Sequence, residues 1–183
     1  MTIQFMKIIA ICGSPRMGNT EFVLKRILTK LEEQGHQARL VLLREKRIQF
    51  CDGCLSCSET GRCKLRDNMQ TIYSQLEESD LIIFGSPNYF NNVTGLMKNF
   101  IDRLFPLYYK NKLRDKKAVA VIVGAPDNME TIKKPADYIK EVADLLNMSF
   151  IGDFYLTVRE SNEAENNPKS MEEISKFVEN LAE

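Results

Sequence analysis

Short apolar runs alternate with amphipathic segments along the chain, and this alternation constrains the fold more than any other feature. Five runs have the length and composition of buried strands: Lys7–Cys12, Ala38–Leu43, Leu81–Phe84, Ala118–Val123 and Phe150–Val158. Segments with helical periodicity follow these runs, at about 19–34, 68–78, 94–104, 130–146 and 168–181, and Pro135 is an alternative start for the fourth of them. The alternation predicts an α/β fold in which helices cover both faces of a parallel sheet. Five strands favour the flavodoxin-like order 2-1-3-4-5 over the six-stranded dinucleotide-binding order.

The length and charge of the chain limit its possible functions. At 183 residues it suits one domain, which we predict to span 1–183 with a cysteine-rich insertion at 51–63. Lys and Arg together number 25, as do Asp and Glu, so neither a nucleic acid nor an anionic membrane is an expected partner. The first residues have the pattern of a strand rather than of a signal peptide, and no apolar run approaches the roughly 20 residues that span a bilayer. We therefore expect a cytoplasmic protein, in which thiols stay reduced.

Three loops at the carboxyl ends of predicted strands are rich in Gly, Ser, Asn and Pro: Gly13–Thr20, Gly85–Asn92 and Gly124–Asn128. Open sheets of this class bind ligands outside the carboxyl ends of their strands, where the strand order reverses. The first loop leads into a helix N-terminus but lacks the Gly-Lys-Ser/Thr ending of a triphosphate loop and the G-x-G-x-x-G of a dinucleotide loop. A terminal monophosphate therefore fits it better than a pyrophosphate, and the candidate contacts are Ser14, Arg16, Gly18, Asn19 and Thr20. The alternative is a capped turn without a ligand.

The second loop places aromatic side chains among amides, an arrangement that suits a flavin ring. Tyr89 and Phe90 offer flat apolar surface, and Asn88 offers hydrogen-bonding groups beside Ser86 and Pro87. The alternative is that these aromatics only cap the core at the end of a strand.

Four of the five cysteines lie in one short segment with the spacing C-x2-C-x2-C-x5-C: Cys51, Cys54, Cys57 and Cys63. Zinc sites usually pair two C-x2-C hairpins across a longer separation. Three cysteines at successive x2 spacing are instead typical of a [4Fe–4S] cluster, and a fourth cysteine nearby completes its ligands. Zinc binding, and thiols that are free or form disulfides, are the alternatives.

Two further residues are better explained by structure than by chemistry. Cys12 precedes the first loop as the nucleophile of a tyrosine-phosphatase loop does, but that chemistry needs Cys-x5-Arg, and Arg16 follows after only three residues. We therefore expect Cys12 to be a buried thiol at the end of a strand. His36, the only histidine, is expected at the surface rather than as a ligand.

Together, these motifs resemble those of the NADPH-dependent FMN reductase family. Gly-Ser-Pro-Arg-x-Gly-Asn-Thr is similar to the family's phosphate motif, Gly-Ser-Pro-x-Tyr-Phe to its flavin-ring motif, and Thr94–Arg103 to the helix that follows. The cysteine spacing is similar to that of the iron–sulfur flavoproteins within this family. The resemblance extends from Lys7 to about Val123 and departs at Asn91, where a Gly is common.

The resemblance implies that FMN is the cofactor, with its phosphate near Ser14, Arg16, Asn19 and Thr20 and its ring along Pro87–Phe90. It also implies an oxidoreductase that passes electrons from NAD(P)H or a ferredoxin through FMN to a small-molecule acceptor, as a homodimer or homotetramer. No side chain is expected to act as a nucleophile or acid–base pair, because the cofactor carries the chemistry. The alternative function is an electron carrier or redox sensor without a substrate of its own.

Overall fold

The apolar runs form one parallel sheet whose three inner strands are buried on both faces, as a sheet between two helical layers requires. The computed structural model describes residues 5–125 and 129–181. Its sheet has the predicted order β2-β1-β3-β4-β5. The strand bounds are β1 (Lys7–Cys12), β2 (Gln37–Leu42), β3 (Leu81–Pro87), β4 (Lys117–Gly124) and β5 (Ser149–Thr157).

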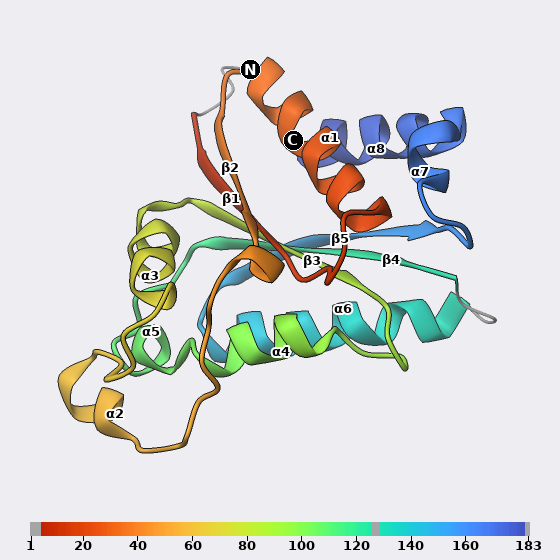
Figure 1. Ribbon diagram of the computed structural model, residues 1–183. Helices are drawn as coiled ribbons and strands as arrows, with labels where there is room; N and C mark the ends of the chain where they lie inside the picture. Colours follow the sequence, from red (N-terminus) through yellow and green to blue (C-terminus); the bar gives the residue numbers. More distant parts are fainter. Residues whose placement is uncertain (1–4, 126–128, 182–183) are drawn as a thin grey trace.

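Helices cover both faces of the sheet, above and below it in Figure 1. One face carries α1 (Asn19–Glu33), α7 (Glu163–Asn166) and α8 (Pro168–Leu181). The other carries α3 (Met69–Glu78), α4 (Gly95–Asp102), α5 (Phe105–Tyr109) and α6 (Met129–Leu145). Among the helices of the described residues, none is both long enough and apolar enough to span a membrane.

Alternate residues of β1 divide between two layers of core. Ile8 and Ala10 pack in the layer that contains residues of α1 and α8, whereas Ile9 and Ile11 pack in the layer that contains residues of α3, α4 and α6. This two-sided burial explains why the inner strands are continuous apolar runs rather than alternating apolar and polar residues.

Most of the cysteine-rich segment lies outside both layers, although Ile48 and Cys63 pack against the layer that contains α3, α4 and α6. Residues 46–68 connect the 3-10 turn η1 (Leu43–Glu45) to α3, and they contain one short helix, α2 (Ser56–Thr60). Figure 1 shows this segment projecting from the body of the protein near α5, which α2 contacts.

The structure corrects several details of the sequence prediction. His36 is 5% exposed rather than at the surface, because its Nδ1 accepts a hydrogen bond from the backbone N–H of Met6 at 3.3 Å. Pro135 lies inside α6 and does not begin it. β3 continues past Phe84 to Pro87, and the short helices α2, α5 and α7 were not predicted.

The fold brings the first two ligand loops together at the carboxyl edge of the sheet. The N–H of Gly13 donates to the carbonyl of Gly85 at 2.7 Å, which joins the end of β1 to β3. The N–H of Asn88 donates to the carbonyl of Val123 at 2.9 Å, which joins the second loop to β4. The close packing leaves no space for a side chain at Gly85, where an added Cβ would lie 2.5 Å from Leu24 Cδ1.

Candidate functional site

The first loop is ordered by its own hydrogen bonds and leads into an uncapped helix. Ser14 is buried, and its hydroxyl donates to the carbonyl of Arg16 at 2.7 Å. Gly18 precedes α1 in an extended conformation, and no side chain in the described part of the chain caps this helix. Thr20 is buried in the first turn, whereas the Arg16 side chain is exposed. The first N–H groups of α1, with their partial positive charge, therefore face the loop.

Asn19 connects this loop to a distant part of the chain. Its Nδ2 donates to the carbonyl of Glu160 at 2.8 Å, and its Oδ1 accepts from the N–H of Ala164 at 3.1 Å. The amide is thus used to hold the turn before α7 against the start of α1. Sequence analysis did not detect this role because the partners are separated by more than 140 residues in the chain. The predicted contact between this side chain and a phosphate stays a prediction.

Thr94 links the two loops, and sequence analysis assigned it no role in the site. Its hydroxyl donates to the carbonyl of Gly13 at 2.6 Å and accepts from the N–H of Met97 at 3.2 Å, which caps α4. Its own N–H donates to the hydroxyl of Ser86 at 3.0 Å. That hydroxyl donates in turn to the carbonyl of Pro87 at 2.8 Å. Ser86 therefore braces the second loop and has no exposed surface for a ligand.

The second loop ends in a tight turn that holds its aromatics outside the core. Tyr89 and Asn92 exchange two backbone hydrogen bonds of 2.9 and 3.0 Å, and both central residues have positive φ, 50° at Phe90 and 60° at Asn91. Asn is among the few residues that adopt this conformation readily, which explains why it can replace the Gly that is common here. Phe90 is fully exposed and Tyr89 is 45% exposed, so these rings do not cap the core.

Asn88 offers an unused acceptor at the start of this turn. Its Nδ2 donates to the carbonyl of Thr131 at 3.4 Å, but its Oδ1 is buried without a hydrogen-bond partner among the described residues. Buried polar atoms are normally paired, so an unpaired oxygen beside the proposed ring position fits a ligand that donates an N–H. In the third loop, Gly124 and Ala125 belong to the described structure, whereas residues 126–128 lie outside the described residues.

The four motif cysteines line one cavity of about 110 Å³. Leu55, Leu65, Phe105 and Pro106 also line it, as does Arg103. Cys51 and Cys54 are exposed, Cys57 and Cys63 are partly buried, and all are unpaired thiols. Nevertheless, no three Cys, His, Asp or Glu side chains within residues 5–125 and 129–181 are close enough together to hold a metal ion. The four cysteines thus line one cavity without forming a ligand cage.

The motif thiols and Cys12 differ in the interactions that set their pKa values. Burial raises the pKa of Cys57, while hydrogen bonds from the backbone and hydroxyl of Ser56 lower the pKa of Cys54. Burial raises the pKa of Cys12 to about 11, and Cys12 has no exposed surface. It is therefore a protonated thiol in the core at neutral pH, which excludes the phosphatase interpretation.

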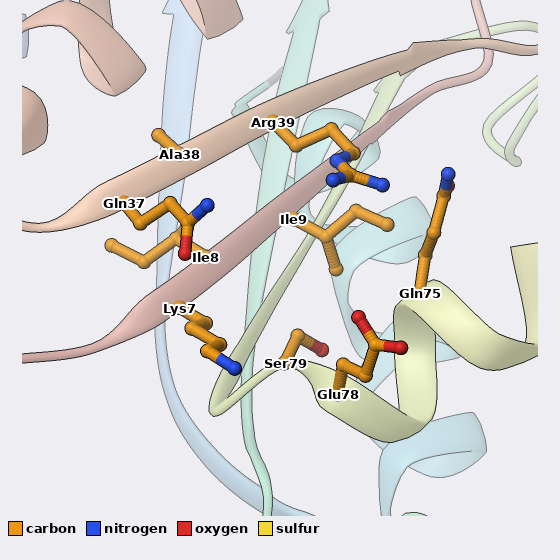
Figure 2. Close-up of a pocket in the computed structure, with 9 residues that line it drawn as sticks. All are labelled: Lys7, Ile8, Ile9, Gln37, Ala38, Arg39, Gln75, Glu78 and Ser79. Carbon is orange, nitrogen blue, oxygen red and sulfur yellow. The ribbon is translucent and has the colours of Figure 1, made fainter.

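A further cavity of about 170 Å³ lies at the opposite, amino-terminal edge of the sheet. Figure 2 shows its lining side chains, with Arg39 of β2 reaching towards Gln75 of α3. It contains none of the predicted site residues, and it lies away from the three ligand loops.

The chain is similar in sequence to known proteins. The model of the family described as NADPH-dependent FMN reductase matches residues 6–163. An iron–sulfur flavoprotein from Methanocaldococcus jannaschii is 40% identical over 124 residues, which are 67% of this chain and 64% of that protein. An FMN-dependent NADPH-azoreductase from Staphylococcus saprophyticus is 31% identical over 102 residues, 54% of this chain and 52% of that protein. The matched region thus spans about half to two thirds of these relatives.

Solved structures show the same fold at low sequence identity. An NAD(P)H:quinone oxidoreductase from Methanothermobacter marburgensis has a TM-score of 0.75 at 14% identity, with 97% of this chain and 96% of that chain covered. A flavodoxin-like WrbA-like protein from Agrobacterium tumefaciens has a TM-score of 0.68 at 14% identity, with 97% and 95% covered. The chain has a five-stranded flavodoxin-like sheet, two motif loops joined at the carboxyl edge of that sheet, and a family match over most of its length. It therefore belongs to the NADPH-dependent FMN reductase family.

Proposed function

We propose that this protein binds one FMN at the carboxyl edge of the sheet and acts as an FMN-dependent oxidoreductase. In this proposal it accepts electrons from NAD(P)H or a ferredoxin and passes them to a small-molecule acceptor, as a homodimer or homotetramer. The observation that carries the proposal is the joining of the two motif loops through Thr94, since one of these loops leads into the uncapped start of α1 and the other carries an exposed aromatic turn.

The two loops suit opposite ends of FMN. The N–H groups at the start of α1 and the exposed Arg16 would hold a terminal phosphate, because a helix N-terminus and a cation both attract an anion. The turn at Tyr89 and Phe90 would lie along the ring, and Asn88 Oδ1 would accept a ring N–H. When bound, FMN would supply both one- and two-electron chemistry, so the chain itself needs to bind, orient and shield the ring.

We further propose that Cys51, Cys54, Cys57 and Cys63 hold a [4Fe–4S] cluster. Their spacing, their position around one cavity and the similarity of the chain to proteins named iron–sulfur flavoproteins support this assignment. Because the sulfurs do not form a ligand cage in this structure, cluster binding would require the segment to close around the metal. A cluster there would add a one-electron site to the protein.

A cationic cavity beside Cys63 supports a ferredoxin as the donor. This cavity of about 580 Å³ lies against the same cysteine and is lined by four cations, Arg62, Arg66, Lys110 and Lys112, with Glu77 as the one carboxylate in its lining. Ferredoxins with acidic surfaces would be steered towards such a site, and the steering would weaken as salt is added.

The first experiment is an assay of iron, acid-labile sulfide and flavin on protein purified without oxygen. About four irons and four sulfides per FMN would support the complete proposal, because this is the composition of one cluster and one flavin. Flavin without iron would leave an NAD(P)H-dependent reductase, and failure to bind FMN after reconstitution would refute the proposal. Saturable reduction of an acceptor would distinguish the enzyme from a simple electron carrier.

A pair of charge-reversed variants tests the donor. Arg62→Glu combined with Arg66→Glu should slow reduction by an acidic ferredoxin and reduce its salt dependence. The matched control combines Lys7→Glu with Arg39→Glu at the cavity in Figure 2, which makes the same charge change on β1 and β2, away from the cysteine-rich segment. Equal slowing of both variants would show that net charge, rather than the cavity beside Cys63, controls the rate.

A further inference from the structure

Arg103 is a buried cation directly after α4, next to the two ends of the cysteine-rich segment. Only 1% of its side chain is exposed, and the same is true of its partner Asp67. The guanidinium donates to both carboxylate oxygens, with 2.6 Å from Nη1 to Oδ2 and 3.3 Å from Nη2 to Oδ1. A bidentate ion pair of this kind fixes the orientation of the guanidinium as well as its position.

The same guanidinium contacts the cysteine-rich segment at two further places. Nη1 donates to the carbonyl of Gln49 at 2.6 Å, and Nη2 donates to Cys63 Sγ at 3.4 Å. Gln49 precedes the first motif cysteine, Cys63 is the last one, and Asp67 lies just before α3. One side chain therefore contacts the beginning, the final thiol and the end of residues 46–68.

Asp67 and Tyr73 make further hydrogen bonds around Arg103. Asp67 accepts from the N–H of Gln49 at 2.9 Å and from the N–H of Met69 at 3.0 Å, so it joins both ends of the segment directly. The buried hydroxyl of Tyr73 donates to the carbonyl of Arg103 at 2.6 Å, which holds the end of α4 against α3. The segment is thus fixed at its two ends, while α2 projects between them.

Stability alone does not account for this arrangement. A buried ion pair rarely stabilises a protein more than an apolar pair of similar size, because both charges lose their hydration. Moreover, Nε of Arg103 has no hydrogen-bond partner among the described residues. A planar group with several fixed donors nevertheless does what an apolar residue cannot: it sets the relative positions of a carboxylate, a carbonyl and a sulfur.

We propose that Arg103 is the positioning residue of the cysteine-rich segment. It holds the Cys63 sulfur and keeps the two ends of the segment together, so that the four cysteines line one cavity. What the thiols bind rests on the proposed function, but the positioning applies equally to protein without metal.

The test uses Arg103→Lys, which keeps the charge and loses the forked donors. In metal-free protein, amide hydrogen exchange over residues 47–66 should accelerate about tenfold or more, because charge-assisted hydrogen bonds at both ends of the segment are lost, while exchange in the sheet is unchanged. Arg44→Lys is the matched control, since Arg44 lies in η1 just before the segment but forms its ion pairs outside it, with Glu21 at 2.6 Å and Glu45 at 3.2 Å. It should leave residues 47–66 as in the wild type.

A milder variant keeps the proposal testable if Arg103→Lys does not fold. Tyr73→Phe removes only the hydroxyl that holds the Arg103 carbonyl, and it should give a smaller acceleration in the same residues. Iron uptake during anaerobic reconstitution should fall in the order of increasing exchange. Unchanged exchange in Arg103→Lys, or an equal increase throughout the sheet, would overturn the proposal. If the wild type takes up no iron, the cluster assignment fails, and the exchange data still decide the role of Arg103.

Discussion

Replacing Thr94 with Val tests whether one hydroxyl supports both ligand loops. Thr94 is 2% exposed, and Val preserves the shape of its side chain while removing the donor to Gly13 and the acceptor for Met97. Each buried polar group left without a partner costs about 1–3 kcal/mol. For the carbonyl and the N–H together, we expect the free energy of unfolding to fall by about 2–6 kcal/mol.

Two assays on the same variant separate stability from binding. In urea, with a denaturant slope of about 2 kcal/mol per molar, the unfolding midpoint of FMN-free protein should fall by about 1–3 M. FMN affinity, measured by quenching of flavin fluorescence, should weaken about tenfold, which corresponds to about 1.4 kcal/mol. The weakening is expected because the first loop loses its anchor to Thr94, whose N–H also holds Ser86 in the second loop.

Thr94→Ser is the control for this experiment. It keeps the hydroxyl and loses a buried methyl group, so it should cost about 1 kcal/mol of stability and retain most of the FMN affinity. If the Val and Ser variants have the same urea midpoint and the same affinity, the hydroxyl does not connect the loops and the reasoning is wrong.

Three further predictions concern packing, the aromatic turn and pH. Gly85→Ala places a Cβ 2.5 Å from Leu24, so thermal unfolding should show a loss of about 1–3 kcal/mol. Gly95→Ala, where nothing lies within 4 Å of the added atom, should show no such loss. Phe90→Gly should leave FMN-free stability unchanged or higher, since Phe90 is exposed with φ 50°, but it should weaken FMN binding in the flavin titration; equal affinity would contradict a ring contact. Burial opposes ionisation of Asp67, but hydrogen bonds from Arg103 and from backbone N–H groups lower its pKa below the unfolded value of about 3.9. The stability from this carboxylate is therefore complete above about pH 4 and lost as the pH falls through the folded pKa, so urea midpoints should fall less steeply below pH 4 in Asp67→Asn than in the wild type.

The sheet could be predicted from the sequence because the patterns that mark strands and helices are local. β1 and α8 have the expected bounds, and the other main elements shift by only a few residues, since an apolar run and a helical period are each visible within one segment. The first two ligand loops were identified because each follows a predicted strand end, where the fold class places its ligand.

The connections within the site were not predictable in the same way. Asn19 forms hydrogen bonds with residues 160 and 164, and Thr94 forms one with Gly13. Arg103 forms hydrogen bonds with three residues of the cysteine-rich segment. Each pairing depends on which elements become neighbours after folding, and each of these residues also has an ordinary local interpretation as a cap or a surface residue. The burial of His36 has the same origin, because its partner Met6 lies directly before β1, the strand that pairs with β2.

Helix α4 gives the two proposed redox sites opposite electrostatic surroundings. It begins just after Thr94, which contacts the second loop, and ends just before Arg103, which contacts Cys63, and its eight residues extend about 12 Å. The aligned peptide dipoles leave about half a positive charge at the first end and half a negative charge at the second. The positive end would favour electron density on the ring proposed at the second loop, while the negative end stabilises the buried guanidinium of Arg103. The same negative end would oppose added negative charge on a cluster beside Cys63, so the field of one short helix would favour reduction of the flavin over reduction of the cluster.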